Sequence, residues 1–471
     1  MKKRLAMVLS AVLIALILVS VFLILQSYSL TEKPFYVGVT YCGNSVDEAK
    51  QLIDKVKTYT NIFVLQSGPL QENQSATVEI CDYAVNNDLD LIVYFGSLDW
   101  KHNVVSGFLN ATTNRWGNHF LGLYYGDELG GNMLDDPPTL SEFRGDHTSV
   151  SFLPSGEIRT YETNTYVMGV NYTDSSEHYN VIKTHYPNGT ITVEHSPPAD
   201  AVIYQPDGTT TLRKPDGSIS IVTGYGSISQ FQSYQQLWDT RPLKNYKDAA
   251  NYFVEKRLDA TNWLHNESSS VKAFTSDYGL YWFDYLGGYD VVLAEFGWNH
   301  TETQHMGLVR GAASLQGKSW GTMLTWKFDH APYMASGTEL YDQMTLAYNG
   351  GAEYVVVFNY APDGDGFGLL QEEHFTALQR FWTEHVEPNG EKAKVMNVEA
   401  VLVLPADYGW GMRNPEDTIW GLWQADDKSL QVWGSLQNAL EVYGEKLDIV
   451  YDDPAFPVSG YRTVLWWNNN G

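Results

Sequence analysis

The stretch Val291-Val292-Leu293-Ala294-Glu295-Phe296-Gly297-Trp298 decides the fold class. Its apolar run has the length of a strand and shows no polar alternation, which is typical of a strand buried on both faces. Residues 303–316 then show helical spacing, and another apolar run follows at 320–326. A strand, a helix and a strand in this order predict a parallel sheet.

The same alternation continues in both directions and gives eight β/α units. The predicted strands cover residues 35–41, 61–66, 89–95, 120–125, 271–276, 290–295, 320–326 and 353–360, and the predicted helices cover 46–59, 76–87, 246–265, 303–316, 340–349 and 372–385. Without residues 137–236, the span 34–389 holds 256 residues. A (β/α)₈ barrel typically needs about 250. We therefore predict an α/β protein whose main domain, residues 34–390, is a TIM barrel.

Two further segments do not belong to this barrel. Between residues 137 and 236, four Pro-x-Gly sequences begin at residues 154, 187, 206 and 215, among alternating Thr, Ile, Val and Tyr. Such sequences form hairpin turns, so we predict a β-hairpin-rich insertion after the fourth strand. Residues 395–471 show strand patterns at 398–404, 447–451 and 461–467 and a helical pattern at 430–443. They predict a small C-terminal α/β domain.

The N-terminus predicts a membrane anchor. Basic residues at positions 2–4 precede 21 uncharged, largely apolar residues, 5–25. As a helix this run spans about 30 Å, which is enough to cross a bilayer. No small-x-small cleavage site follows, so an uncleaved anchor over residues 1–30 is favoured over a cleaved signal peptide. The basic end stays inside, which places the body outside the cell as a single-pass membrane protein.

Possible glycosylation sites agree with that location. Six Asn-x-Ser/Thr sequons are present, at Asn73, Asn110, Asn171, Asn188, Asn266 and Asn299. Such a sequon is an N-glycosylation acceptor when it lies on the surface of a secreted protein.

Composition narrows the function. The chain of 471 residues has a net charge of −26 and is 44% hydrophobic, which excludes an intrinsically disordered protein. The acidic balance argues against nucleic acid and against binding of the body to anionic lipid. The 15 Trp and 31 Tyr residues fit either an aromatic core or stacking platforms for sugar rings. Two cysteines, Cys42 and Cys81, leave a single bridge or two thiols open, and exclude a disulfide framework or a Cys-based metal centre.

Active sites of TIM barrels lie at the carboxyl ends of the strands, and here those ends are rich in acids and aromatic residues. Asp127 and Glu128 follow the fourth predicted strand, and Glu295 ends the sixth. Glycosidic bond cleavage needs two carboxyl groups, one to protonate the leaving oxygen and one to attack the anomeric carbon or activate water. We therefore take Glu128, Glu295 and Asp127 as candidate catalytic residues, with surface or ion-paired acids as the alternative.

Other residues at the same ends are candidates for binding a sugar. Four aromatic residues could stack against the sugar rings: Tyr41, Trp100, Trp298 and Trp326. Five polar residues could hydrogen-bond to sugar hydroxyl groups: Asp99, Asp277, Lys327, His330 and Asn359. For each Trp, packing at the barrel mouth is an equal alternative. The ends lack an HExxH motif, a Gly-rich phosphate loop and a serine nucleophile elbow, so no metal or cofactor is expected.

Three segments resemble glycoside hydrolases. Residues 120–129 resemble the fourth-strand segment of barrel glycoside hydrolases, where a G-x-Y-x-x-D-E run ends in the acid/base Glu. Residues 291–298 are similar to the E-F-G-W segment that carries the nucleophile in clan A, and 345–360 resemble the last helix and strand of those barrels. Residues 395–471 resemble the flavodoxin-like domain of family 42 β-galactosidases. The resemblance implies that Glu128 is the acid/base and Glu295 the nucleophile.

One departure leaves these roles open. Clan A carries its nucleophile on the seventh strand, whereas Glu295 is on the sixth predicted strand; other barrel glycosidases use strands four and six. In the alternative assignment, Asp127 or Glu128 is the nucleophile and Glu295 is the acid. A carboxyl separation of about 5–5.5 Å would indicate a retaining enzyme, and one of about 6.5–9.5 Å an inverting enzyme.

These observations predict a membrane-anchored extracellular glycoside hydrolase, with retention favoured. The alternative is a non-catalytic carbohydrate-binding or cell-envelope surface protein on the same barrel. The expected partners are a carbohydrate, the membrane through the N-terminal helix, and a second copy of the chain through the insertion or the C-terminal domain. Nucleic acid is not expected.

Overall fold

The computed structural model describes residues 33–96, 98, 101–112, 114–136, 150–153, 155–166, 177–196, 200–222, 227–238, 245–298, 300–360 and 368–468. The predicted anchor, residues 1–30, lies outside this part of the chain. Within it, no helix combines the length and the apolar character that a bilayer span requires.

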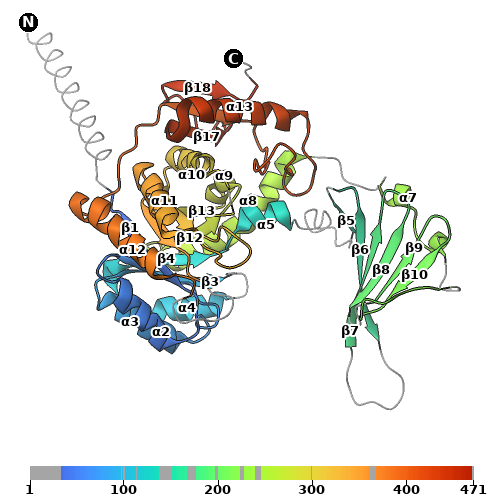
Figure 1. Cartoon of the computed structure of the whole chain (residues 1–471), viewed down its shortest axis with the longest axis horizontal. Coiled ribbons are helices and arrows are strands. Elements are labelled where there is room, and N and C mark those ends of the chain that lie inside the picture. The colour runs from blue at the N-terminus through green and yellow to red at the C-terminus, as the bar shows by residue number, and fades with distance from the viewer. Residues whose placement is uncertain are drawn as a thin grey trace, which may run out of the picture.

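Eight parallel strands close into a barrel, in the order β1-β15-β14-β13-β12-β4-β3-β2 (Figure 1). They are β1 (Tyr36–Tyr41), β2 (Ile62–Leu65), β3 (Asp90–Gly96), β4 (Phe120–Tyr125), β12 (Lys272–Asp277), β13 (Val291–Phe296), β14 (Ser319–Leu324) and β15 (Tyr354–Val357). The predicted barrel is confirmed, and every strand overlaps its predicted range. Glu295 therefore lies on the sixth barrel strand, as the sequence predicts.

Helices cover the outside of the barrel. They are α2 (Val46–Val56), α3 (Gln74–Val85), α4 (His102–Thr112), α5 (Leu129–Asp135), α8 (Tyr246–Glu267), α9 (Tyr281–Leu286), α10 (Glu302–Gln316), α11 (Gly337–Asn349) and α12 (Glu372–Phe381). Sequence periodicity missed α4, α5 and α9. Helix α5 contains two glycines, which are poor helix formers, and α9 is almost wholly buried and so has no polar face to show a period.

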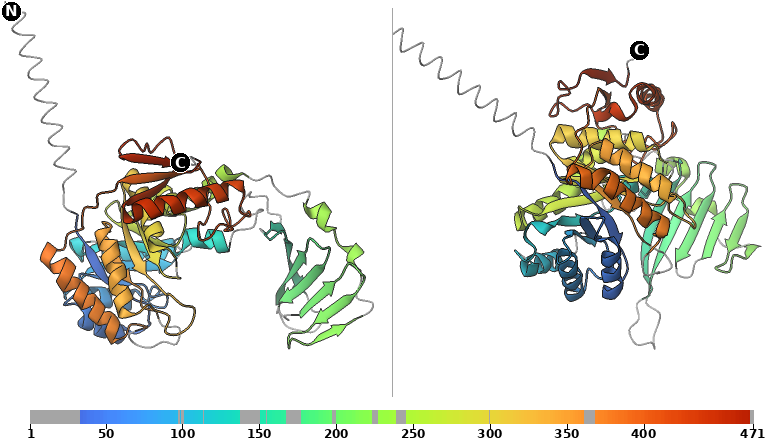
Figure 2. Two further views of the ribbon diagram at one scale, coloured as in Figure 1. Left: turned by 45° about the horizontal axis from the view of Figure 1, so that its top comes forward. Right: turned by 60° about the vertical axis from the view of Figure 1, so that its left-hand side comes forward.

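The insertion forms a separate antiparallel sheet of seven strands, in the order β11-β10-β9-β8-β7-β6-β5. They are β5 (Val150–Phe152), β6 (Ile158–Tyr166), β7 (Glu177–His185), β8 (Ile191–Ser196), β9 (Asp200–Tyr204), β10 (Thr210–Arg213) and β11 (Ile219–Ile221). The Pro-x-Gly sequences lie at its turns, where each glycine has a positive φ, from 80° to 92°. Both views of Figure 2 show this sheet to one side of the barrel.

A small sheet of parallel strands follows the barrel, in the order β17-β16-β18. It contains β16 (Ala400–Leu404), β17 (Leu447–Tyr451) and β18 (Thr463–Trp466), with α13 (Asp427–Tyr443) packed against it (Figure 1). Barrel helix α10 lies against β17, and a Cβ on Gly307 or Gly311 would come within 2.7 or 2.8 Å of a β17 carbonyl oxygen. Buried Arg310 of α10 donates to Asp448 at 2.7 Å. The two domains are therefore tightly joined.

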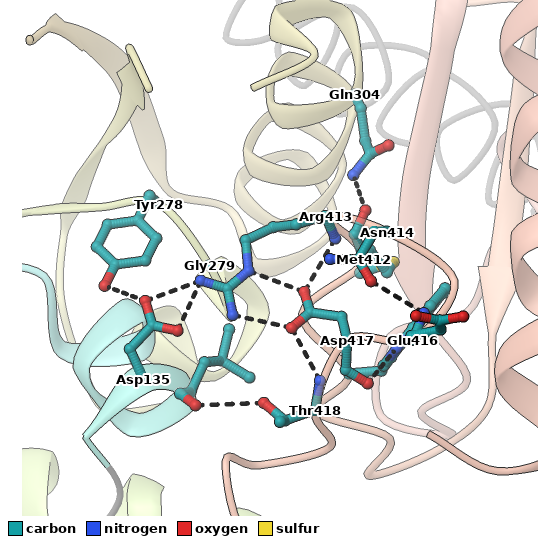
Figure 3. A network of polar contacts seen from close by, with 12 residues as sticks. Asp135, Tyr278, Gly279, Gln304, Met412, Arg413, Asn414, Glu416, Asp417 and Thr418 are labelled. Atoms are coloured by element: carbon teal, nitrogen blue, oxygen red, sulfur yellow. Dashed lines mark hydrogen bonds and ion pairs between the residues drawn. The ribbon is translucent and has the colours of Figure 1, made fainter. Parts of the chain in front are cut away.

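A loop of the C-terminal domain reaches the carboxyl-end face of the barrel (Figure 3). Arg413 donates through Nε and Nη2 to the two carboxylate oxygens of Asp417, both at 2.8 Å, and through Nη1 to Asp135 at 2.8 Å. Asp135 ends helix α5 and also accepts from the Tyr278 hydroxyl at 2.8 Å. The guanidinium thus fixes the end of α5 from outside the barrel.

This contact predicts a stability effect. We expect Arg413→Met to lower the free energy of unfolding by about 2–3 kcal/mol, because buried Asp417 loses its cation. The measurement is urea unfolding followed by tryptophan fluorescence. The matched control is Arg380→Met, which breaks an exposed pair with Glu384 on α12 and should have little effect. Equal effects of the two substitutions would contradict the account.

Candidate active site

A pocket of about 260 Å³ opens at the carboxyl ends of the barrel strands. Its lining residues are Gln66, Asp127, Glu128, Glu295, Trp298, Met323, Thr325, Trp326, Phe358 and Tyr360. The three predicted catalytic acids and two of the predicted aromatic residues are among them. The structure therefore brings together residues that follow strands β2, β4, β13, β14 and β15.

Glu128 reaches the pocket from a strained turn. After β4 the chain turns at Gly126, and Glu128 then has φ 54° and ψ 39°, the left-handed conformation, at the N-cap of α5. That conformation costs a residue with a side chain about 1–2 kcal/mol. The backbone N–H of Glu128 donates to the Ser276 carbonyl at 2.9 Å, which holds the turn against the end of β12.

Asp277, at the end of β12, fixes the start of α5. Its fully buried carboxylate accepts backbone N–H groups from Gly131 at 2.8 Å, Tyr278 at 2.7 Å and Gly279 at 3.0 Å, and another from Gly130. The two α5 glycines permit this approach, since a Cβ on Gly131 would lie 2.0 Å from the Tyr278 ring. Burial raises the pKa of Asp277 to about 6. The predicted sugar-binding role of Asp277 is wrong, because its oxygens are occupied by the backbone and do not line the pocket.

Ser276, the residue before Asp277, links two acids of the pocket. Its hydroxyl lies 2.9 Å from Asp127 Oδ1 and 2.7 Å from Glu295 Oε1, and 2.9 Å from the hydroxyl of Tyr124. Tyr124 in turn donates to Asp127. A serine hydroxyl has one proton; because the Tyr124 hydroxyl donates to Asp127, the Ser276 proton is available to Glu295. The two hydroxyls set the orientation of both carboxyl groups.

Glu128 and Glu295 line the same pocket, and the charge of Glu128 disfavours ionisation of Glu295. Burial, reinforced by the charge of Asp127, raises the pKa of Glu128 to about 7. Burial, with the charges of Glu128 and Asp127, raises the pKa of Glu295 well above its ordinary value, and burial raises that of Asp127. Near neutral pH the two carboxyl groups therefore keep protons that exposed glutamates lose, so this pocket can supply a proton donor.

Four buried polar atoms of lining residues have no hydrogen-bond partner in the part of the chain that the structure describes. They are Gln66 Oε1, Glu295 Oε2, Thr325 Oγ1 and Trp326 Nε1. An unpaired buried polar atom is costly, on the order of 1–3 kcal/mol. Their convergence on one pocket indicates a polar ligand that supplies the missing hydrogen bonds.

One wall of the pocket is aromatic. The rings of Trp326 and Tyr360 are stacked, with their centroids 6.0 Å apart. The Trp298 ring packs edge-on against Trp326, with a centroid distance of 6.1 Å. Trp298 and Tyr360 are exposed to 37% and 41%, far more than other large apolar residues near the barrel mouth such as Met323. Open aromatic faces beside acids suit the apolar face of a sugar ring.

Four predicted binding residues do not line this pocket. The Tyr41 hydroxyl donates to the Ser45 carbonyl at 2.8 Å, and Lys327 pairs with Glu339 at 2.5 Å. His330 is exposed and bonds Asp329, and buried Asn359 accepts the backbone N–H of Leu370 at 3.2 Å. Each of these side chains makes a loop contact in this structure, and a sugar-binding role for them stays a prediction. Asp99 and Trp100 lie outside the described residues.

Sequence reasoning missed the five other lining residues, Gln66, Met323, Thr325, Phe358 and Tyr360, and the network residues Tyr124 and Ser276. Each lies at or just beyond the carboxyl end of a barrel strand, so position was the available signal. The residue types gave no signal, because a lone Ser, Thr or Gln does not indicate a functional site.

Metal-binding groups and the two cysteines are the remaining chemistry to consider in the described part of the chain. Among the described residues, no group of three or more His, Cys, Asp or Glu side chains is arranged to hold a metal ion. Cys42 and Cys81 are both free, so the predicted alternative of a disulfide between them is wrong. Burial raises the pKa of both thiols, that of Cys42 to about 12, which makes them poor nucleophiles.

Comparison with known proteins supports the fold. No protein-family model and no curated relative matches the chain. A β-galactosidase from Rahnella sp. R3 matches with a TM-score of 0.51 at 10% identity, over 93% of this chain and 67% of that chain. A β-galactosidase from Marinomonas ef1 matches with a TM-score of 0.49 at 10% identity, over 92% of this chain and 72% of that chain. A β-1,4-D-mannanase from Cryptopygus antarcticus matches with a TM-score of 0.38 at 11% identity, over 78% of this chain and 95% of that chain. The Rahnella structure confirms the resemblance to barrel glycoside hydrolases at the level of the fold.

The raised pKa of Glu128 predicts a pH effect on stability. Folding raises this pKa from 4.5 to about 7, so the stabilisation is present below about pH 4.5 and is lost as the pH rises to about 7. Between these two pH values, we expect the free energy of unfolding to fall by up to about 2 kcal/mol less in Glu128→Gln than in the wild-type protein. This figure allows for the partial exposure of Glu128. Urea unfolding at the two ends of this range measures it.

The control for this prediction is Glu72→Gln, at an exposed position outside the pocket. That variant should follow the pH dependence of the wild-type protein. A Glu128→Gln variant that loses as much stability between the two pH values as the wild type would contradict the assignment of a raised pKa to this carboxyl group.

Proposed function

We propose that the chain is a glycoside hydrolase that uses Glu128 and Glu295 as its two catalytic carboxyl groups. The observation that carries this proposal is that these two acids line one pocket at the carboxyl ends of the barrel strands, with no Lys, Arg or His among its described lining residues. When one of the two keeps its proton and the other is ionised, the pair provides one acid and one base at neutral pH, which is what both steps of glycoside hydrolysis need. The barrel that the chain shares with a β-galactosidase supports the same class.

The placement of the two acids favours Glu295 as the nucleophile. Glu295 belongs to rigid β13, is 2% exposed and is oriented by Ser276 at 2.7 Å. Glu128 lies on a turn and is more exposed, so it can exchange protons with water and leaving groups.

The reaction then follows two displacements. Glu295 attacks the anomeric carbon while Glu128 donates its proton to the glycosidic oxygen, which leaves as an alcohol. The ionised Glu128 next takes a proton from water, whose oxygen attacks the same carbon and releases Glu295. Asp127, held by Tyr124 and Ser276, keeps a negative charge beside the developing oxocarbenium ion.

The pocket also supports a carbohydrate substrate. Its aromatic wall offers faces for a sugar ring, and the unpaired atoms Gln66 Oε1, Thr325 Oγ1 and Trp326 Nε1 offer partners for hydroxyl groups. A location outside the cell and a tether to its membrane remain part of the proposal. They rest on the sequence of residues 1–25 alone.

Hydrolysis of a glycan panel tests this function. We expect release of reducing ends from at least one glycan, and a loss of about 10²–10⁴-fold in rate for Glu128→Gln and for Glu295→Gln. The matched control is Glu339→Gln, an acid of the same barrel face that pairs with Lys327 outside the pocket. Binding of a glycan without hydrolysis would favour the non-catalytic alternative, and activity that survives both substitutions would refute the assignment.

A further inference from the structure

We propose that the sugar unit held in this pocket carries a free, positively charged amino group, so that the substrate is a glycan of non-acetylated amino sugars. The inference deepens the proposed function and rests on the same pocket. It follows from the charge of the lining, from the kind of hydrogen-bonding atoms left unpaired, and from the electron-rich aromatic wall.

The lining carries excess negative charge. Among the described residues it contains three carboxyl groups, those of Asp127, Glu128 and Glu295, and no Lys, Arg or His. When Glu128 and Glu295 hold one proton between them, the three groups keep two negative charges. Hydrolysis as described above uses one carboxylate as the nucleophile, and the Asp127 charge that stands beside the oxocarbenium ion can also pair with a cation on the sugar.

Nearby cations of the described chain do not neutralise this charge. Lys327 is held by Glu339 at 2.5 Å, and Arg413 is held between Asp417 and Asp135. Lys101 lies beside Gly96 at the end of β3 and does not line the pocket. The charges that act on Glu128 and Glu295 come from other acids, Asp127 and Asp277 in both cases. A cation on the ligand would therefore be the partner of this site.

The unpaired atoms favour a donor-rich ligand. Gln66 Oε1 is an acceptor, Glu295 Oε2 accepts when the carboxyl group is ionised, and both side chains are more than nine-tenths buried; Thr325 Oγ1 can accept as well. Only Trp326 Nε1 must donate. An ammonium group offers three N–H donors and no acceptor, so it satisfies such a set better than a hydroxyl group does.

The aromatic wall adds to this preference. Trp298, Trp326 and Tyr360 line the pocket with the acids, and a cation over such rings gains about 0.5–2 kcal/mol. An acetylated amine would be neutral, and its carbonyl oxygen, itself an acceptor, would face the acceptor oxygens of the pocket lining. A uronic acid would place a fourth carboxylate beside three. Both chemistries fit the pocket less well than an amine.

Binding of matched monosaccharides tests the inference. The probes are glucosamine, glucose and N-acetylglucosamine, and the corresponding galactose set, titrated by calorimetry at about pH 6, where an amine with a pKa of about 8 is charged. We expect the amine to bind about tenfold or more tightly than its hydroxyl parent and its acetylated form in at least one set. Asp127→Asn and high salt should both reduce that ratio.

Two controls keep the test specific. Glu295→Gln should abolish the preference for the amine, whereas Glu339→Gln should leave it unchanged. Equal or tighter binding of the neutral sugars, no binding of either amine, or a preference that survives Glu295→Gln would overturn the inference. Amine binding with no hydrolysis of any glycan would instead refute the proposed function and leave the inference standing.

Discussion

The hydrogen bonds between the Asp277 carboxylate and the backbone at the start of α5 are the contact on which the site depends. They join the ends of β4 and β12, and they allow Glu128 to occupy a left-handed conformation that it would not keep alone. The preceding residue, Ser276, orients Asp127 and Glu295. Two consecutive residues of one barrel strand thus place three acids, and the C-terminal domain secures the far end of the same helix through Arg413.

The site also costs stability. Three acids are gathered in a pocket whose described lining has no cation, and polar atoms of Gln66 and Thr325 are left unpaired. A protein interior normally avoids both features. Their presence together in one pocket is what a binding site demands, because groups that satisfy one another have nothing left for a ligand.

The sequence predicted the barrel well, because alternating apolar runs and amphipathic helices follow directly from burial in a parallel sheet. It also placed Glu128 and Glu295 correctly at strand ends. It failed where residue type is ambiguous. Asp277 and Glu295 both end apolar strands, yet one carboxylate faces backbone N–H groups and the other a pocket, and only the path of α5 decides which. Thr325 and Tyr360 gave no signal because their role arises from strands that meet only in the closed barrel.

The central claim is that at least one of Glu128 and Glu295 retains a proton at neutral pH. Difference infrared spectroscopy between the wild-type protein and the Glu128→Gln/Glu295→Gln double variant tests it most directly. The account predicts a protonated carboxyl band near neutral pH that belongs to the wild type and is missing from the double variant. A spectrum in which both carboxyl groups are fully ionised at that pH would contradict the account.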